Sequence, residues 1–322
     1  HLRPRRQRQM CIRDRFGAGF IEACREQGIF YISNYNTNVT LEGVSPLRST
    51  ISSSTIRETS FQSFVKEGSH NNLTVIGGAQ VSKILFENDV AIGVEYIVDG
   101  QPQSVTCHKE IVLSAGAINS PKILMNSGIG AKRHLEDMGI PVLVDSVHVG
   151  QNLQDALLFS LQWKTSRPLE IPPEAPNGNR RNEGYAIAWT NLNGEHQPKT
   201  CIEMMPGLYT PHQTVELLKN HFTITGGAMR LQSRGWVKLA SSDPTVAPEI
   251  DINFFDNSAD LDEAVEAFHT ARSIGDSSAL NNIRAEELVP GKRIKTDEEI
   301  KSWILGHFYS CLLYTSPSPR DS

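Results

Sequence analysis

The stretch of this sequence best suited to chemistry lies around residue 116, where small residues meet the start of a helix. Residues 110–117 run from an apolar segment into Ser-Ala-Gly-Ala, and a glycine there lets the backbone approach a bound group closely. Ser120 and Pro121 suit the N-cap and first position of a helix, whose N-terminus can face negative charge. Taken alone, these residues favour an ordinary strand–turn–helix packing joint, and a site for an anionic ligand is the alternative.

Other residues that could do chemistry form weaker patterns. The five cysteines include no CxxC pair, which argues against a disulfide scaffold and a zinc site. None of the ten histidines has a spacing that suggests a catalytic partner, and His307 is expected to pack on the last helix. Gly17 and Gly19 lack a third glycine and a preceding strand, so we reject a phosphate-binding loop there.

The first half of the chain must position the glycine-containing turn with strands and short helices. A helix is expected over 20–27, a surface loop over 33–60 and a helical turn or two over 59–66. Alternating or apolar runs then predict strands over 73–76, 80–86, 91–98, 104–108, 110–114 and 141–144. Residues 99–100 predict a hairpin turn between two of these strands. This half is completed by two predicted helices, one from Ser120 to residue 127 and one over 132–138, and by a polar loop over 149–155.

The second half has a different character. Separate β-type runs, divided by loops rich in Pro, Gly and Asn, show no βαβ rhythm and favour an antiparallel sheet over 157–163, 185–189, 201–205, 222–225 and 236–239. Residues 258–274 predict an amphipathic helix, and Thr296 with Glu299 forms a capping-box pattern that opens another.

The two ends, residues 1–15 and 311–322, are expected to be translated sequencing adapters. They lack periodicity, and codons that can encode 10–14 and 311–316 are reverse complements of each other. A basic arm and a Ser/Pro tail are the alternative. The net charge of the whole chain is −5, and residues 16–310 carry −10 once the +5 of residues 1–15 is removed. An acidic body argues against nucleic acid as a partner, and no apolar run is long enough to span a membrane.

Residues 116–130, which read GAINSPKILMNSGIG, closely resemble the second signature of the glucose-methanol-choline (GMC) family of flavin oxidoreductases. Residues 72–84, the VGQNLQD loop at 149–155 and residues 233–250 are similar to further conserved segments of that family. The resemblance covers nearly all of 16–310. Within the family, the sequence is most similar to insect glucose-dehydrogenase-like members. It implies an incomplete Rossmann-like α/β FAD-binding domain over 16–156 and a truncated α+β substrate-binding domain with an antiparallel sheet over 157–310.

The resemblance also implies which residues contact the cofactor, FAD. Val81 aligns with a valine whose backbone contacts the flavin adenine, although periodicity alone assigns it to the core. Ala115 and Gly116 are nearby candidates. Asn152 and Asp155 are expected to line the cofactor or close the loop over it, with loop capping as the alternative.

Two family features are not found at the expected places. The GxGxxG turn is absent, and the catalytic histidine motif should follow Tyr309, where the expected adapter begins. We therefore assign no catalytic residue and expect the chain alone to be inactive. Ala156 stands where the family usually has histidine after the NLQD string.

The expected function is that of a fragment of an FAD-dependent oxidoreductase acting on CH–OH groups of a small alcohol or sugar. The alternative is a non-catalytic secreted binding protein derived from the same fold, for which Ala156 is the hint. The sequons at Asn38 and Asn72 would be used only in a secreted parent. Substrate, electron acceptor, oligomeric state and localisation stay open.

Overall fold

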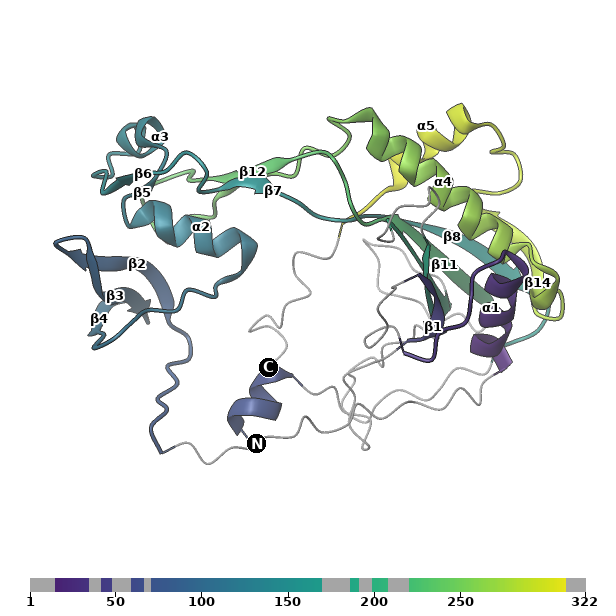
Figure 1. The fold of residues 1–322 in the computed structure, drawn as a ribbon, viewed down its shortest axis with the longest axis horizontal. Helices are drawn as coiled ribbons and strands as arrows, with labels where there is room; N and C mark the ends of the chain where they lie inside the picture. The colour runs from purple at the N-terminus through teal and green to yellow at the C-terminus, as the bar shows by residue number, and fades with distance from the viewer. Residues whose placement is uncertain are drawn as a thin grey trace.

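The computed structural model describes residues 15–34, 42–47, 59–66, 71–169, 186–190, 199–207 and 220–310, which form two bodies joined by a ribbon of strands (Figure 1). The small body contains strands β2 to β6 with helices α2 and α3, and the large body contains a six-stranded sheet with α1, α4 and α5. The adapter prediction applies to residues 1–15 and 311–322, and of these the structure describes only Arg15, the first residue of α1.

The sheet of the large body is antiparallel throughout, in the order β1–β9–β10–β11–β8–β14, as the sequence predicted for this half. Alternate apolar residues of β8, from Leu157 to Trp163, are buried on one face of the sheet. Helices α1, α4 and α5 cover that face with their apolar sides and complete the main core. The elements are α1 (Arg15–Glu26), β1 (Gly43–Pro46), β8 (Leu157–Thr165), β9 (Ala186–Thr190), β10 (Thr200–Pro206), β11 (His221–Ala228), α4 (Ser258–Gly275), the 3-10 turn η2 (Ser278–Leu280), β14 (Arg284–Val289) and α5 (Asp297–His307).

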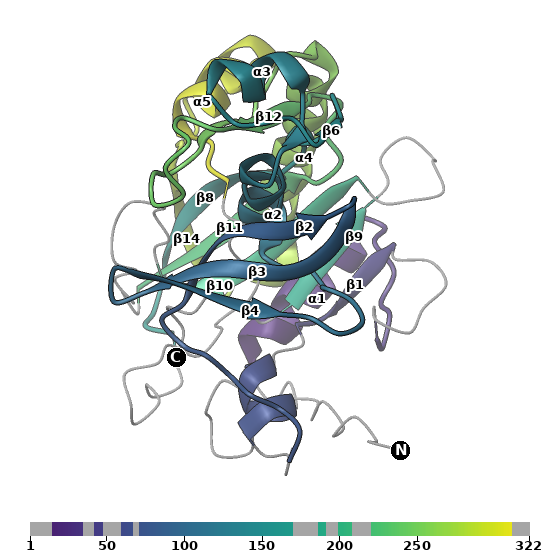
Figure 2. The same cartoon turned by 90° about the vertical axis from the view of Figure 1, so that its left-hand side faces the viewer.

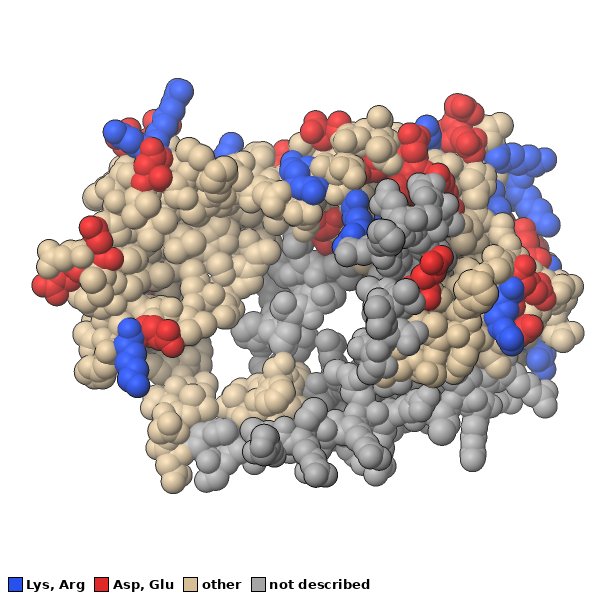
Figure 3. Space-filling view, viewed as in Figure 1, with Lys and Arg blue, Asp and Glu red and all other residues tan. Residues whose placement is uncertain are grey.

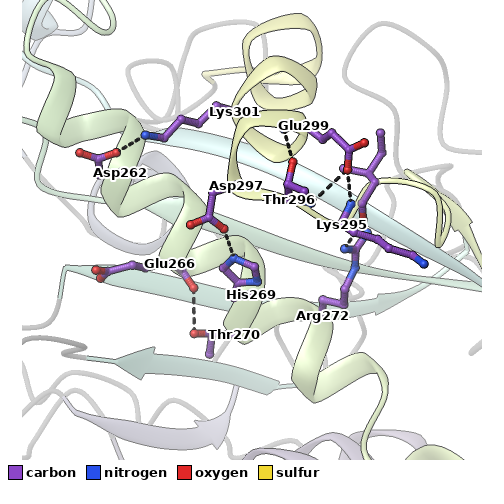
Figure 4. A network of polar contacts seen from close by, with 11 residues as sticks. Asp262, Glu266, His269, Thr270, Arg272, Lys295, Thr296, Asp297, Glu299 and Lys301 are labelled. Atoms are coloured by element: carbon purple, nitrogen blue, oxygen red, sulfur yellow. Dashed lines mark hydrogen bonds and ion pairs between the residues drawn. The ribbon is translucent and has the colours of Figure 1, made fainter.

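Capping side chains start the two long helices of the large body. Asn257 accepts a hydrogen bond from the backbone N–H of Ala259 at 3.0 Å and opens α4. The predicted capping box is confirmed, since Thr296 Oγ1 accepts from Glu299 N at 3.2 Å and Glu299 Oε2 accepts from Thr296 N at 3.0 Å. Polar contacts join α4 to α5 (Figure 4): Lys301–Asp262 at 2.6 Å and His269–Asp297 at 2.7 Å. An ion pair of 2.7 Å between Arg272 and Glu287 joins α4 to β14.

The small body is built from a meander and two short helices. Strands β2 (Gln80–Glu87), β3 (Val90–Val98) and β4 (Gln101–Thr106) pair in sequence order, and the predicted turn between the last two has Asp99 and Gly100 at φ 51° and 76°. Helices α2 (Gly116–Asn126) and α3 (Lys132–Asp137) follow, with the parallel pair β5 (Ile129–Gly130) and β6 (Val144–Asp145). The helix ends predicted at Gly128 and Gly139 have the positive φ of such caps.

A ribbon of three strands links the bodies: β7 (Gln151–Leu153), β12 (Gly235–Lys238) and β13 (Glu249–Asp251). Gly150, at φ +79°, allows its carbonyl to accept from Val237 N at 2.6 Å, and a Cβ on this glycine would collide with the Val237 carbonyl. Among the described residues, no helix combines the length and the apolar character needed to cross a bilayer.

The structure corrects several expected elements. Residues 73–76 and 110–114 are not strands, because no described segment pairs with them, and unpaired backbone cannot form a ladder. The loop expected over 33–60 contains β1, whose polar composition hides its pairing with the distant β9. Only the last residue of the strand expected over 141–144 belongs to β6, and the loop expected over 149–155 contains β7. The π-helical turn η1 (Phe61–Lys66) lies where a helical turn was expected.

Candidate functional site

The N-terminus of α2 has the geometry of an anion-facing helix end. The helix begins at Gly116 rather than at Pro121, so Ser120 is not its N-cap but lies inside the helix. Its Oγ accepts a hydrogen bond from the backbone N–H of Ala115, just before the helix, at 3.1 Å. Gly116 has φ +82°, which favours glycine, and open space lies where its Cβ would point. The first turn carries no acidic side chain. Its backbone N–H groups and the positive end of the helix dipole are therefore available to a negatively charged ligand.

Val81 lies on β2, which packs along α2. Ser127 Oγ, just past the end of α2, accepts from Ile84 N at 2.8 Å. At the other end of the strand, Gln80 Nε2 and Lys122 Nζ both donate to the Pro244 carbonyl, at 2.8 and 2.7 Å. Burial lowers the pKa of Lys122, and the Asp243 carboxylate offsets part of that shift. These bonds fix the strand of Val81, the helix of Gly116 and the turn after β12 relative to one another.

Asn152 and Asp155 differ in what the structure shows of them. Asn152 has φ +62° within β7, a left-handed conformation that asparagine tolerates, and its side chain is exposed. Asp155 Oδ1 accepts from the next backbone N–H, that of Ala156, at 2.8 Å. The Asp155 contact agrees with the loop-capping alternative. Because α2 contacts β12, the partner of β7, Asn152 belongs to the same assembly as Val81 and Gly116, whereas Asp155 stands at the entrance to β8.

A second candidate region lies on the side of the large sheet that the helices leave uncovered, which faces the small body (Figures 1 and 2). We call it the polar face, and its members come from three adjacent strands: Ser160, Gln162, Glu203, Thr223 and Thr225. Figure 3 shows the molecule hollowed between the two bodies beneath the ribbon. The polar face is therefore placed toward the interior of the molecule, opposite the main core.

Hydrogen bonds join the members of this face across the strands. Tyr309 OH lies 2.9 Å from Ser160 Oγ, which lies 3.3 Å from Thr225 Oγ1. Two backbone bonds of 2.9 Å between Tyr309 and Leu158 hold the end of the described chain against β8. Glu203 stands opposite Thr225 in the register of β10 and β11 and continues the same row.

Glu203 is the carboxyl group of the polar face as defined above. Burial raises its pKa to about 7, because desolvation penalises the charged carboxylate. Burial and the neighbouring Glu203 also raise the pKa of Cys201, which keeps that thiol protonated. A carboxyl group that titrates near neutral pH is typical of functional sites, and sequence reasoning missed it. The signal was present, since residues 201–205 alternate Cys-Ile-Glu-Met-Met between a polar and a buried face.

The described histidines with printed contacts have structural roles. His307 stacks on Trp303 with ring centroids 4.8 Å apart, as expected for a residue packed on the last helix. His134 Nε2 accepts from Leu239 N at 3.1 Å, and His269 pairs with Asp297. His196 and His212 lie outside the described residues. In the part of the chain that the structure describes, no three His, Cys, Asp or Glu residues could share a metal ion.

Comparison with known proteins gives consistent matches. Two family models described as GMC oxidoreductase match residues 12–158 and 232–309. An oxygen-dependent choline dehydrogenase of Pectobacterium carotovorum subsp. carotovorum (strain PC1) is 31% identical over 83% of this chain and 51% of that protein. The mitochondrial choline dehydrogenase of Homo sapiens is 32% identical over 73% of this chain and 43% of that protein. The chain thus spans about half the length of these curated relatives.

Solved structures agree on the fold. A pyridoxine 4-oxidase from Mesorbium loti matches with a TM-score of 0.81 and 23% identity, over 95% of this chain and 58% of that chain. A formate oxidase of Aspergillus oryzae RIB40, studied for the modification of its FAD, matches with a TM-score of 0.80 and 20% identity, over 92% of this chain and 59% of that chain. The predicted fold class, an α/β FAD-binding domain with an antiparallel substrate domain, is confirmed.

Proposed function

Because the chain belongs to the GMC oxidoreductase family, we propose that it forms part of a flavoenzyme that oxidises the CH–OH group of a small alcohol. FAD is the cofactor of this family, as the sequence led us to expect. The observation that carries the proposal is the N-terminus of α2, where Gly116 has φ +82° and no acidic residue neutralises the helix dipole. The free backbone N–H groups at this helix end would suit the phosphates of an anionic dinucleotide.

In this proposal the cofactor lies between the two bodies. Backbone groups of Val81, Ala115 and Gly116 contact it from the small body, and Asn152 and Asp155 approach it from the ribbon and the start of β8. When bound, FAD supplies the electron acceptor for alcohol oxidation, while the protein binds and orients both molecules. The polar face supplies hydroxyl groups and one carboxyl group on the substrate side.

The substrate class is an alcohol. The relatives found are named for choline, which is a small polar alcohol, so such an alcohol is favoured over a sugar. The finer assignment to insect glucose-dehydrogenase-like members stays a prediction. That this chain alone does not turn over substrate also stays a prediction.

A titration of the 322-residue chain with FAD, followed by quenching of flavin fluorescence, tests the proposal. Ala117→Asp places a negative charge in the exposed first turn of α2. This charge stabilises the helix but repels an anionic ligand, so we expect roughly fivefold to tenfold weaker FAD binding. Ala131→Asp at the N-cap of α3 is the matched control and leaves FAD affinity unchanged. A wild-type chain that fails to bind FAD, or equal effects of both substitutions, would contradict the proposed site.

A further inference from the structure

Lys122 is a buried lysine in the middle of α2, with only 8% of its surface exposed. Its Nζ donates to the Pro244 carbonyl at 2.7 Å. Burial lowers the pKa of Lys122, and Asp243 offsets part of that shift. A methionine of similar length would fill the same space without the cost of removing a charge from water. The ammonium group is therefore a poor source of stability, and what it does provide is a bond to one defined point outside the helix.

The Pro244 carbonyl is shared by donors from two different elements. Gln80 Nε2, at the start of β2, donates to the same oxygen at 2.8 Å. A carbonyl oxygen has two lone pairs and can accept both hydrogen bonds. Helix α2 and strand β2 are thus linked in series through one atom of the turn that follows β12.

Helix α2 and strand β2 run side by side in the same direction, and their later residues are joined directly. Ser127 Oγ, just past the end of α2, accepts from Ile84 N at 2.8 Å. Asn126 Nδ2 donates to the Ser82 carbonyl at 3.4 Å. These two bonds do not involve Pro244, so they stay in place when the link through its carbonyl is broken. Loss of that link should therefore loosen only the early part of both elements.

The early part of both elements carries the proposed cofactor contacts. Val81 follows Gln80 directly on β2. Gly116, at the N-terminus of α2, lies about 9 Å along the helix axis from Lys122. A dinucleotide is an extended molecule, so its adenine and its pyrophosphate can occupy both places at once only where the separation between strand and helix suits it.

We propose that Lys122 is a positioning residue for this dinucleotide, because through the Pro244 carbonyl it holds the N-terminus of α2 at a fixed separation from the backbone of Val81. This inference rests on the proposed function and deepens it. Lys122 acts through Pro244 and not by touching the ligand. Its contribution is preorganisation, which raises the affinity for a ligand that reaches both elements and leaves unchanged the affinity for an anion bound at the helix end alone.

The test compares ADP, which carries adenosine and a pyrophosphate group, with inorganic pyrophosphate. Both are titrated calorimetrically into the 322-residue chain. We expect wild type to prefer ADP by about tenfold or more, and Lys122→Met to reduce that preference about fivefold while its affinity for pyrophosphate stays within about twofold. Lys122→Arg, which keeps a charged donor, should retain the preference. Lys83→Met, at a partly exposed lysine of β2 paired with Glu95, is the matched control and leaves both affinities unchanged.

Three outcomes of this comparison overturn the inference. Wild type that binds ADP no more tightly than pyrophosphate, or binds neither, has no preference for Lys122 to support. A preference that survives Lys122→Met shows that the ammonium is not needed. A preference that Lys122→Arg loses as fully as Lys122→Met shows that the donor to Pro244 is not what matters.

A merely structural role of Lys122 predicts a different pattern. Replacing a buried charge by an apolar side chain of similar length is often neutral or stabilising, so the urea midpoint of Lys122→Met should be unchanged or higher while its ADP affinity falls. Stability and binding then change independently or in opposite directions. A lower midpoint together with equal losses of affinity for ADP and pyrophosphate would show that Lys122 only supports the fold, and would overturn the inference.

Gln80 provides a second variant at an exposed position, where folding does not depend on how the interior tolerates a change. Gln80→Leu removes the other bond to Pro244. Because the two bonds lie in series, Gln80→Leu should reduce the ADP preference about as much as Lys122→Met, and the double variant should lose no more than either single variant. Losses that add in the double variant would mean that the two residues act independently, which contradicts the link.

A direct attraction between the Lys122 ammonium and the ligand phosphates is the competing explanation. It predicts that removal of the neighbouring carboxylate in Asp243→Asn strengthens the binding of both ADP and pyrophosphate. The amide oxygen of this variant can still accept from Thr245 N and Oγ1, as Asp243 Oδ1 does at 2.8 and 2.7 Å, so the turn is retained. We expect both affinities to stay within about twofold of wild type, and tighter binding of both ligands would overturn the positioning role.

The two proposals fail separately. If FAD binds and Ala117→Asp weakens that binding, but Lys122→Met leaves the ADP preference intact, the assignment of Lys122 is wrong and the flavoenzyme proposal stands. If FAD does not bind, while ADP binds with a preference that depends on Lys122, the flavoenzyme proposal fails and the link holds for an adenine nucleotide. If neither FAD nor ADP binds, both proposals fail.

Discussion

The two bodies of this chain differ in how they obtain their cores. The large body joins strands and helices from distant parts of the sequence around one extensive cluster of fully buried side chains. The small body has a cluster of only Met125, Leu135 and Leu239, and several of its apolar residues stay on the surface, with Val112 78% exposed. The large body therefore supplies most of its own stability, whereas the small body needs further contacts for its apolar surface.

The strongest test of this difference removes the largest buried side chain of the large body. Trp163 stacks on Phe222 with ring centroids 5.3 Å apart, and α4 approaches it so closely that a Cβ on Gly275 would collide with the indole. We expect Trp163→Ala to lower the free energy of unfolding by about 3–5 kcal/mol, measured by urea denaturation with circular dichroism. Trp236→Ala, at a half-exposed tryptophan of the ribbon, should cost about 1 kcal/mol or less. Equal losses of unfolding free energy in the two variants would remove the distinction between core and ribbon.

A smaller loss is expected from the small body. Leu135 is fully buried among Met125, Leu239 and Gly130, and Leu135→Ala should cost about 2–3 kcal/mol because the site is surrounded by few other buried groups. Hydrogen exchange should show reduced protection in α2 and α3 and unchanged protection in β8 and β11. Leu305→Ala, at an exposed leucine of α5, is the control. A uniform loss of protection in both bodies would mean that they unfold as one unit.

Local signals in the sequence predicted the large body well. The β-type runs of β8 and β11, the amphipathic pattern of α4 and the Thr296 capping box all act over a few residues, and the structure confirms each. The strand β1 was missed because its pairing with β9 depends on residues more than a hundred positions away. The apolar run 110–114 was predicted as a strand for the opposite reason, since its composition suits a ladder that no described segment provides.

The candidate site was only partly predictable. Residues near Gly116 were identified from glycine, serine and proline, whose backbone preferences are local, although Pro121 misplaced the helix start. Glu203 was not identified, because a single glutamate in an apolar run gains meaning only when the neighbouring strands place hydroxyl groups beside it. The assignments of Val81, Ala115, Gly116, Asn152 and Asp155 to FAD stay predictions.

The smallest expected effect concerns the pH dependence of the large body. The pKa of Glu203 is raised from 4.5 to about 7 in the folded protein, so between these values the folded state binds more protons than the unfolded state. Stability should therefore fall as the pH rises through this window and level off above it. This residue should contribute about 1–2 kcal/mol, less than the full shift would give, because Glu203 is partly exposed. Urea denaturation at pH 5 and pH 8.5 measures the slope. Glu203→Gln should remove this contribution and make the protein relatively more stable at pH 8.5, while the exposed Glu286→Gln leaves the slope unchanged. Parallel pH curves for wild type and Glu203→Gln would show that the carboxylate is as well solvated in the folded state as in the unfolded state, and the polar face would then resemble an ordinary exposed surface.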